Sequence, residues 1–210
     1  MRSALRRAAV LLLTQLGTAL AAEQLVRGRG FVVEDPLPGV NPSRRHITVV
    51  ALEVRGQQTI VGDPLANGAT LTVVANGATP SSQTFVLPAG AFAEPNGPGW
   101  SRRASRNGRL VSYSYTDERG ENGPVTHLLI RQTRATFRFR ATAEGRGNNP
   151  EITVLPPDPG TDGGAVFTIT GGDTYCLAFG GAAEGRITDN DRELFRVVKP
   201  RGRACPVAAP

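Results

Sequence analysis

The sequence predicts an all-β protein built as an antiparallel β-sandwich. Short stretches with alternating apolar and polar residues recur along the chain, and clusters of glycine, proline, asparagine and aspartate separate them. The 3.6-residue apolar period of a helix is nearly absent after residue 22. We therefore expect residues 23–210 to form one sandwich domain with about ten strands.

The first 22 residues are expected to be a signal peptide. A basic segment precedes an apolar run at residues 8–20, and the small residues Ala19 and Ala21 follow as a cleavage pattern. The run is shorter than the roughly 18 apolar residues that a membrane span needs. We expect cleavage near Ala21 or Ala22, a secreted or periplasmic location, and no membrane span in the mature protein.

The clearest strand shows its two faces directly. In residues 135–143, Phe137 and Phe139 fall on one face, and Arg138 and Arg140 fall on the other. One face is thus expected in the core and the other in water. By the same reasoning, the other strands are expected at residues 30–34, 46–54, 68–75, 82–88, 109–117, 123–131, 164–170, 173–179 and 193–198.

Two segments of the chain are similar to each other. Residues 63–73 and 158–169 both run from Asp-Pro through a glycine-containing turn into a strand. Such residues introduce strands in any all-β protein, so the similarity has an ordinary explanation. The alternative is that residues 23–147 and 148–210 are two related halves that share one core.

Cys176 and Cys205 are the only cysteines. Neither belongs to a C-x-x-C pattern or has the histidine spacing of a zinc site, and two cysteines are too few for a structural zinc site. A nucleophilic cysteine needs a base, and the chain has only two histidines. In an exported protein this favours a disulfide, which would hold the C-terminal tail against the sheet.

Four segments of the chain carry a set of motifs in a fixed order: residues 31–53, 111–145, 175–181 and 195–206. Together they resemble a recurring group of uncharacterised secreted bacterial β-rich modules. These modules have a Tyr-x-Tyr-x-Asp motif at the end of one strand and an Asn-Gly-Pro-Val motif at the start of the next. Their C-terminal region runs from a Cys-x-x-Phe-Gly-Gly motif to a Cys-Pro motif. Most of the mature chain is covered by the resemblance, and the position of Ser112 is a departure because the group has glycine there. The resemblance implies a β-rich fold and export, and it implies no activity or catalytic residues.

The charge of the chain is mildly basic. Without the three arginines of the leader, the formal net charge falls from +6 to +3. The arginines are spread along the chain and aromatic residues are few, at 6%, so no basic groove with stacking rings is indicated. We therefore expect no nucleic-acid partner.

Two sets of residues are candidates for ligand binding. Trp100 precedes Arg102 and Arg103 in a stretch rich in proline and glycine, where an exposed indole would suit a sugar ring or an anionic polymer. The alternative, which we favour, is that Trp100 folds back over the core. Arg138 and Arg140 form a positive stripe on the wet sheet face, which would suit an acidic polysaccharide.

Other candidate chemistry has an ordinary interpretation. The acidic clusters at residues 117–122 and 189–193 could hold calcium, but they fit hairpin turns better. We expect His127 to share a strand face with Val125 and Leu129 and to be buried and hydrogen-bonded. No cofactor or metal is expected.

Together these features indicate a secreted protein that is not an enzyme. We expect a structural or adhesive role at the cell exterior or in the periplasm, with an unknown partner. One alternative is a binding module for anionic or envelope polysaccharide. Another is an uncharacterised hydrolase, because two catalytic carboxylates can be close in space without being close in sequence.

Overall fold

A computed structural model describes residues 21–95, 97–146 and 152–208. Residues 1–20 of the expected signal peptide lie outside the described residues, as does the boundary between the two expected halves. None of the helices in the described ranges has the length and apolar character needed to cross a membrane.

The all-β prediction is confirmed. The described residues form thirteen strands and three short helical turns. The strands are β1 (Glu23–Leu25), β2 (Gly28–Glu34), β3 (His46–Val54), β4 (Ala69–Gly77), β5 (Ser81–Leu87), β6 (Gly99–Ala104), β7 (Leu110–Thr116), β8 (Val125–Thr133), β9 (Thr136–Glu144), β10 (Gly160–Ile169), β11 (Thr174–Gly180), β12 (Arg186–Asn190) and β13 (Leu194–Val198), and the turns are η1 (Pro42–Arg44), α1 (Pro64–Asn67) and η2 (Gly181–Ala183).

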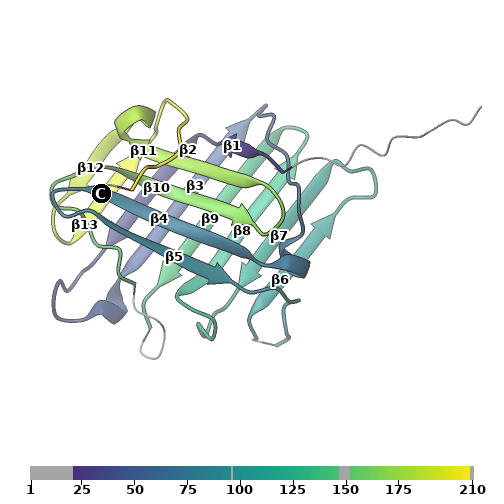
Figure 1. Ribbon diagram of the computed structural model, residues 1–210, viewed down its shortest axis with the longest axis horizontal. Coiled ribbons are helices and arrows are strands. Elements are labelled where there is room, and N and C mark those ends of the chain that lie inside the picture. The colour runs from purple at the N-terminus through teal and green to yellow at the C-terminus, as the bar shows by residue number, and fades with distance from the viewer. Residues whose placement is uncertain (1–20, 96, 147–151, 209–210) are drawn as a thin grey trace, which may run out of the picture.

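The strands form two sheets that pack face to face. The small sheet has the order β1-β11-β10-β4-β5, and the large sheet has the order β12-β13-β2-β3-β9-β8-β7-β6. Neighbouring strands are antiparallel except for β1, which lies parallel to β11. Figure 1 shows the strands of the small sheet crossing in front of those of the large sheet.

Strands from both ends of the chain occur in each sheet. In the small sheet β10 and β11 lie beside β4, and in the large sheet β13 pairs with β2. The two similar segments lead into β4 and β10, which are antiparallel neighbours with Ala69 opposite Ile169. Both sheets therefore depend on contacts between residues that are far apart in the sequence.

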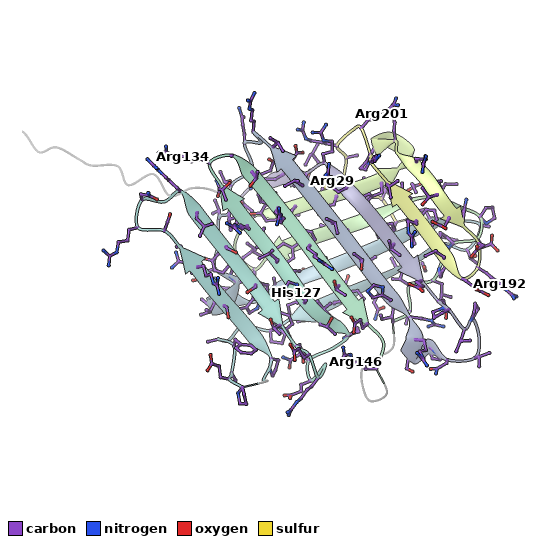
Figure 2. The ribbon with its side chains drawn as sticks, turned by 180° about the vertical axis from the view of Figure 1, so that it is seen from behind. Arg29, His127, Arg134, Arg146, Arg192 and Arg201 are labelled. Atoms are coloured by element: carbon purple, nitrogen blue, oxygen red, sulfur yellow. A yellow bond between two sulfur atoms is a disulfide. The ribbon has the colours of Figure 1, made fainter. Side chains whose placement is uncertain are left out.

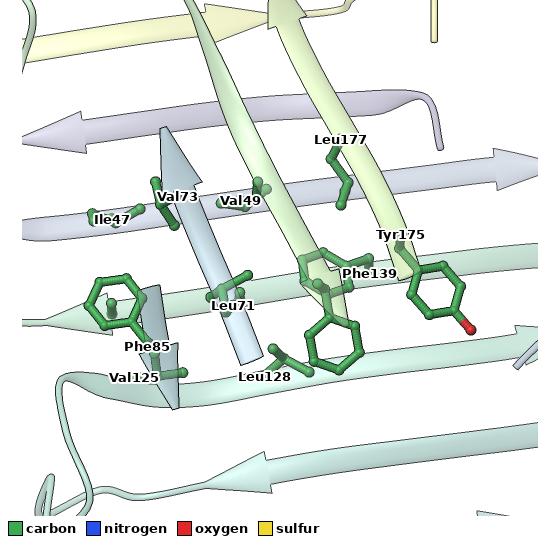
Figure 3. Close-up of a cluster of buried hydrophobic side chains, with 14 of the residues drawn as sticks. Ile47, Val49, Leu71, Val73, Phe85, Val125, Leu128, Phe139, Tyr175 and Leu177 are labelled. Carbon is green, nitrogen blue, oxygen red and sulfur yellow. The ribbon is translucent and has the colours of Figure 1, made fainter. Parts of the chain in front are cut away.

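The core lies between the inner faces of the two sheets. Phe137 and Phe139 of β9 are buried as the alternation predicted, while Arg138 and Arg140 are exposed. The ring of Phe139 lies 5.5 Å from that of Phe167 in the small sheet, measured between centroids. Figure 3 shows side chains of both sheets meeting in this layer.

Three strands were not expected from the sequence: β1, β6 and β12. All three lie at the edges of their sheets. The residues of β12 are almost all exposed, and those of β6 after Trp100 are exposed as well. An edge strand with little buried surface needs no apolar alternation, so the pattern that reveals a central strand is missing.

The C-terminal tail ties the two sheets together. Cys205 forms the predicted disulfide with Cys176 of the small sheet. Two residues earlier, the Arg203 guanidinium donates from Nε and Nη2 to the Glu53 carboxylate of the large sheet, at 2.6 and 2.9 Å. The carbonyl of Val207 accepts a 2.8 Å hydrogen bond from Asn76 of β4.

Candidate binding face on the large sheet

The outer face of strands β6 to β9 carries three of the arginines that the sequence singled out, namely Arg103, Arg138 and Arg140. Because alternate residues of these strands point into the core, the residues between them point outward. Figure 2 views this side of the molecule, and His127 lies near its centre.

The register of the sheet brings arginines from three strands into one patch. Arg103 lies opposite Ser112, Ser112 lies opposite Arg131, and Arg131 lies opposite Arg138. Arg140 follows two residues along β9 on the same face. Neighbouring strands are about 4.8 Å apart, so these guanidinium groups cover a short strip across the strands. We call the outer surface that carries Arg103, Arg131, Arg138 and Arg140 the arginine face.

The arginine face is not neutralised by carboxylates. Among the described residues, none of its four arginines belongs to a salt bridge. Glu144 lines the same hollow as Arg140, but its carboxylate is bonded to Arg146 at 2.6 Å. Like charges directly opposite each other on neighbouring strands destabilise a sheet. We therefore expect the opposed pair of Arg131 and Arg138 to destabilise the fold, since no carboxylate of the described residues offsets the repulsion.

The surface between these arginines is polar and hollowed. A hollow of about 370 Å³ lies between Arg103 and Arg131 and is lined by the hydroxyl-bearing residues Ser112 and Ser114. A second hollow of about 320 Å³ lies beside Arg140. His127 lines both hollows.

His127 shares a face of β8 with Leu129, as alternation predicts, but it does not share that face with Val125. The register of β8 against β9 shifts between Val125 and His127, so that Val125 and Thr126 are both buried. The bulge turns Val125 to the inner face, while His127 stays on the outer face with Leu129. The ring is half-buried and, among the described residues, makes no hydrogen bond to another side chain, so the expected buried, hydrogen-bonded histidine was wrong. Burial, together with the charge of Arg140, lowers the pKa of His127, so the ring is neutral at pH 7.

Trp100 is not part of this face. Its side chain is 1% exposed, and its indole nitrogen donates a 2.9 Å hydrogen bond to the carbonyl of Pro88. The indole ring packs against that of Tyr115, so it cannot stack on a sugar. Arg102 points to the same side of β6 as Trp100 and places its guanidinium 5.9 Å from the centre of the Tyr113 ring. Trp100 therefore leaves the list of ligand-binding candidates. Arg102 is exposed, but it does not lie on the same face as Arg103, Arg138 and Arg140.

The two acidic clusters form turns. The Asp117 carboxylate accepts the backbone N–H groups of Glu121 and Asn122, each at 2.8 Å. The Asp191 carboxylate accepts those of Glu193 and Leu194, each at 2.9 Å. These hydrogen bonds close the two turns, as the turn interpretation predicts. In the described part of the chain, the one group of three possible metal ligands contains both cysteines, which are bonded to each other.

A groove elsewhere on the molecule gives less information about a possible ligand. A groove of about 220 Å³ lies between β5 and the residues just before β8, lined by Phe85, Tyr115 and Pro124 among others. No charged side chain lines it. It offers no chemistry that would select a particular ligand.

Comparisons of the chain with protein-family models, with curated proteins and with solved structures found no match. The resemblance to secreted bacterial modules remains an expectation based on sequence motifs. The function must be argued from the geometry of the arginine face.

Removal of one arginine from the opposed pair is expected to stabilise the protein. Replacing Arg131 with threonine removes the repulsion from Arg138 and keeps a residue that favours strands. We expect the free energy of unfolding to rise by about 0.5 kcal/mol and the melting temperature to rise by about 1–2 °C. Differential scanning calorimetry at low salt measures the change. The control is Arg106→Thr, in the turn before β7. If Arg131→Thr raised the melting temperature no more than Arg106→Thr does, the opposed charges would have no cost to stability.

Proposed function

We propose that this protein is an exported, non-catalytic binding protein that attaches to acidic polysaccharide through the arginine face. The proposal depends on one observation above all: Arg131 and Arg138 occupy directly opposed positions on neighbouring strands, and neither has a carboxylate partner among the described residues. A bound polyanion would supply the missing negative charge. Functional sites often destabilise the unbound protein, and binding of the ligand then offsets that loss of stability.

The chemistry of the face suits an anionic sugar polymer. A guanidinium group binds a carboxylate or sulfate through two parallel hydrogen bonds. Ser112, Ser114 and the neutral ring of His127 offer donors and acceptors for sugar hydroxyls between the charged positions. No phenylalanine, tyrosine or tryptophan points outward from β6 to β9 in the described residues, and stacking on such rings is what single-stranded nucleic acids require.

Export is supported by two features. The disulfide between Cys176 and Cys205 is compatible with an extracellular or periplasmic location, because such bonds persist in oxidising compartments. The first residues have the layout of a signal peptide. At the cell exterior, a binding face on a rigid sandwich would serve an adhesive or structural role in a polysaccharide layer.

A double substitution tests the proposal. Arg138→Ala combined with Arg140→Ala is expected to weaken binding to dextran sulfate and to polygalacturonate at least about tenfold at low salt, since each lost charge-assisted hydrogen bond is worth more than 1 kcal/mol. The matched control is Arg192→Ala combined with Arg201→Ala, which removes the same charge at the far end of the large sheet (Figure 2). Isothermal titration calorimetry at 50 and 200 mM salt measures both affinities, with uncharged dextran as the negative ligand.

The control decides between specific and general attraction. If both double variants lose affinity equally, net charge alone explains the binding and the arginine face is not a site. If the wild-type protein binds neither polyanion, the proposal is wrong. Shortening of the polysaccharide that depends on His127 would instead support the hydrolase alternative.

A further inference from the structure

Asp173 is a buried carboxylate at the start of β11. Asp173 is 0% exposed. Its two carboxylate oxygens accept hydrogen bonds from three different segments of the chain. Oδ1 accepts the backbone N–H of Ala22 at 2.9 Å. Oδ2 accepts from Gln24 Nε2 at 2.6 Å and from the backbone N–H of Val61 at 2.8 Å.

All of these donors are uncharged. The other donors to Oδ2 are the Tyr175 hydroxyl at 3.2 Å and the Thr59 hydroxyl at 3.5 Å. Burial and the nearby Asp173 raise the pKa of Tyr175, so this hydroxyl keeps its proton. Among the described residues no arginine, lysine or histidine forms a salt bridge with Asp173. A buried carboxylate without a cation is costly, because hydrogen bonds replace only part of its lost hydration.

The residue that contacts Oδ1 is Ala22, which lies where cleavage of the leader is expected, near Ala21 or Ala22. An endopeptidase that removes signal peptides selects small side chains at the last residue before the cut and at the residue two positions earlier. For a cut after Ala21, these two residues are Ala21 and Ala19. The next residue is Ala22, whose nitrogen lies 2.9 Å from Asp173. Its carbonyl accepts the N–H of Thr174 at 3.0 Å, so the backbone of Ala22 is fixed at the edge of the small sheet.

We propose that the Ala21–Ala22 peptide bond is the processing site and that the new α-ammonium group of Ala22 forms an ion pair with Asp173. In this step one water molecule adds across the bond, which leaves a carboxylate on Ala21 and an amine on Ala22 that takes up a proton. The nitrogen that donates one hydrogen bond as an amide then becomes the cation that Asp173 lacks. This inference goes beyond the binding function and shares with it only the premise of export.

The ion pair couples maturation to stability. β1 begins at the next residue and pairs with β11 from Glu23 opposite Thr174 to Leu25 opposite Cys176. A charged first residue bound to Asp173 would hold this short edge strand in the sheet. The uncut chain has only the neutral hydrogen bond at the same place, so it should unfold more easily.

Two mature forms that differ by one residue test the inference. One form begins at Ala22, and the other begins at Ala21, so its ammonium group is displaced by one residue from Asp173. We expect the Ala22 form to melt about 5 °C higher. We expect Asp173→Asn to lower its melting temperature and to remove the difference between the two forms.

A third form separates charge from hydrogen bonding. Acetylation of the Ala22 amine keeps an N–H donor but removes the positive charge, so this form should melt with the Ala21 form. It also keeps the test decisive if Asp173→Asn fails to fold. Equal melting temperatures for the free and acetylated Ala22 forms would overturn the ion pair. An exported chain whose intact mass begins at any residue other than Ala22 would overturn the processing site.

Discussion

Loss of the disulfide is expected to lower the free energy of unfolding by roughly 3 to 4 kcal/mol. The bond joins cysteines 29 residues apart and closes a loop that includes β12 and β13. In the chain-entropy account, the gain comes from the unfolded chain, which loses freedom when it is cross-linked. This is a large share of the 5 to 15 kcal/mol that typically holds a domain together. The variant is Cys176→Ala combined with Cys205→Ser.

Urea denaturation gives two independent readings of this change. The midpoint should fall, and the dependence of the unfolding free energy on urea should rise, because an unfolded chain without a cross-link exposes more surface. The melting temperature should fall by about 10 °C. Val86→Ala, at an exposed site of β5, is the control and should change stability by less than about 0.5 kcal/mol. An unchanged midpoint would mean that the other tail contacts hold the structure without the disulfide.

Replacement of Arg203 with alanine is the second large effect, and it should depend on pH. The Glu53 side chain is 1% exposed and faces the core from β3, while the Arg203 side chain is 48% exposed. Without Arg203, the carboxylate keeps only the 2.7 Å hydrogen bond from the N–H of Arg27. Breaking a fully buried ion pair costs 3 to 5 kcal/mol, and because this guanidinium is half exposed we expect about 2 kcal/mol at pH 7.

The direction of the pH dependence follows from the state of Glu53. Burial favours the neutral acid, but the hydrogen bonds and charge of Arg203, with the N–H of Arg27, outweigh it and lower the pKa of Glu53 below its ordinary value. A carboxyl whose pKa is lower in the folded state stabilises the protein above its unfolded pKa. That contribution is lost as the pH falls through the folded pKa. The difference between wild type and Arg203→Ala should therefore be largest at pH 7 and shrink towards pH 3.

Urea denaturation at pH 7, 5 and 3 measures this difference. Glu53→Gln combined with Arg203→Ala is the control, since it removes the buried charge, and it should be more stable at pH 7 than Arg203→Ala alone. A pH-independent cost of Arg203→Ala would mean that packing of the arginine stem, and not the ion pair, holds the tail. Neither tail variant should change the affinity for polyanions below its melting temperature, because the arginine face lies on strands that the tail does not contact through Arg203 or Cys205.

Part of the arginine face could be predicted because it depends on strand period alone. Phe137 and Phe139 mark the inner face of one strand, so Arg138 and Arg140 had to point outward wherever that strand lies in the fold. The partners of these arginines depend on register instead. Arg103 and Arg131 join them only because β6, β7, β8 and β9 are aligned in a particular way, and no local pattern records that alignment.

The positions of two other residues could not have been found by alternation. A bulge in β8 turned Val125 into the core and away from the face of His127, although the sequence around it gave no sign of an extra residue. Trp100 stands among prolines and glycines that suggest a loop, yet it belongs to an edge strand whose inner side is covered by Tyr115. In both cases a contact with another strand determined which way the side chain points.

The sequence by itself determined the fold class, the inner face of the central strands and the disulfide, because periodicity and cysteine number are local properties or simple counts. Only the tertiary structure decided which residues far apart in the chain meet. Asp173 lies 151 residues from Ala22, and Arg203 lies 150 residues from Glu53. The physical reason is that burial of both sheets sets the strand order, and the strand order then brings these polar groups together where each needs a partner.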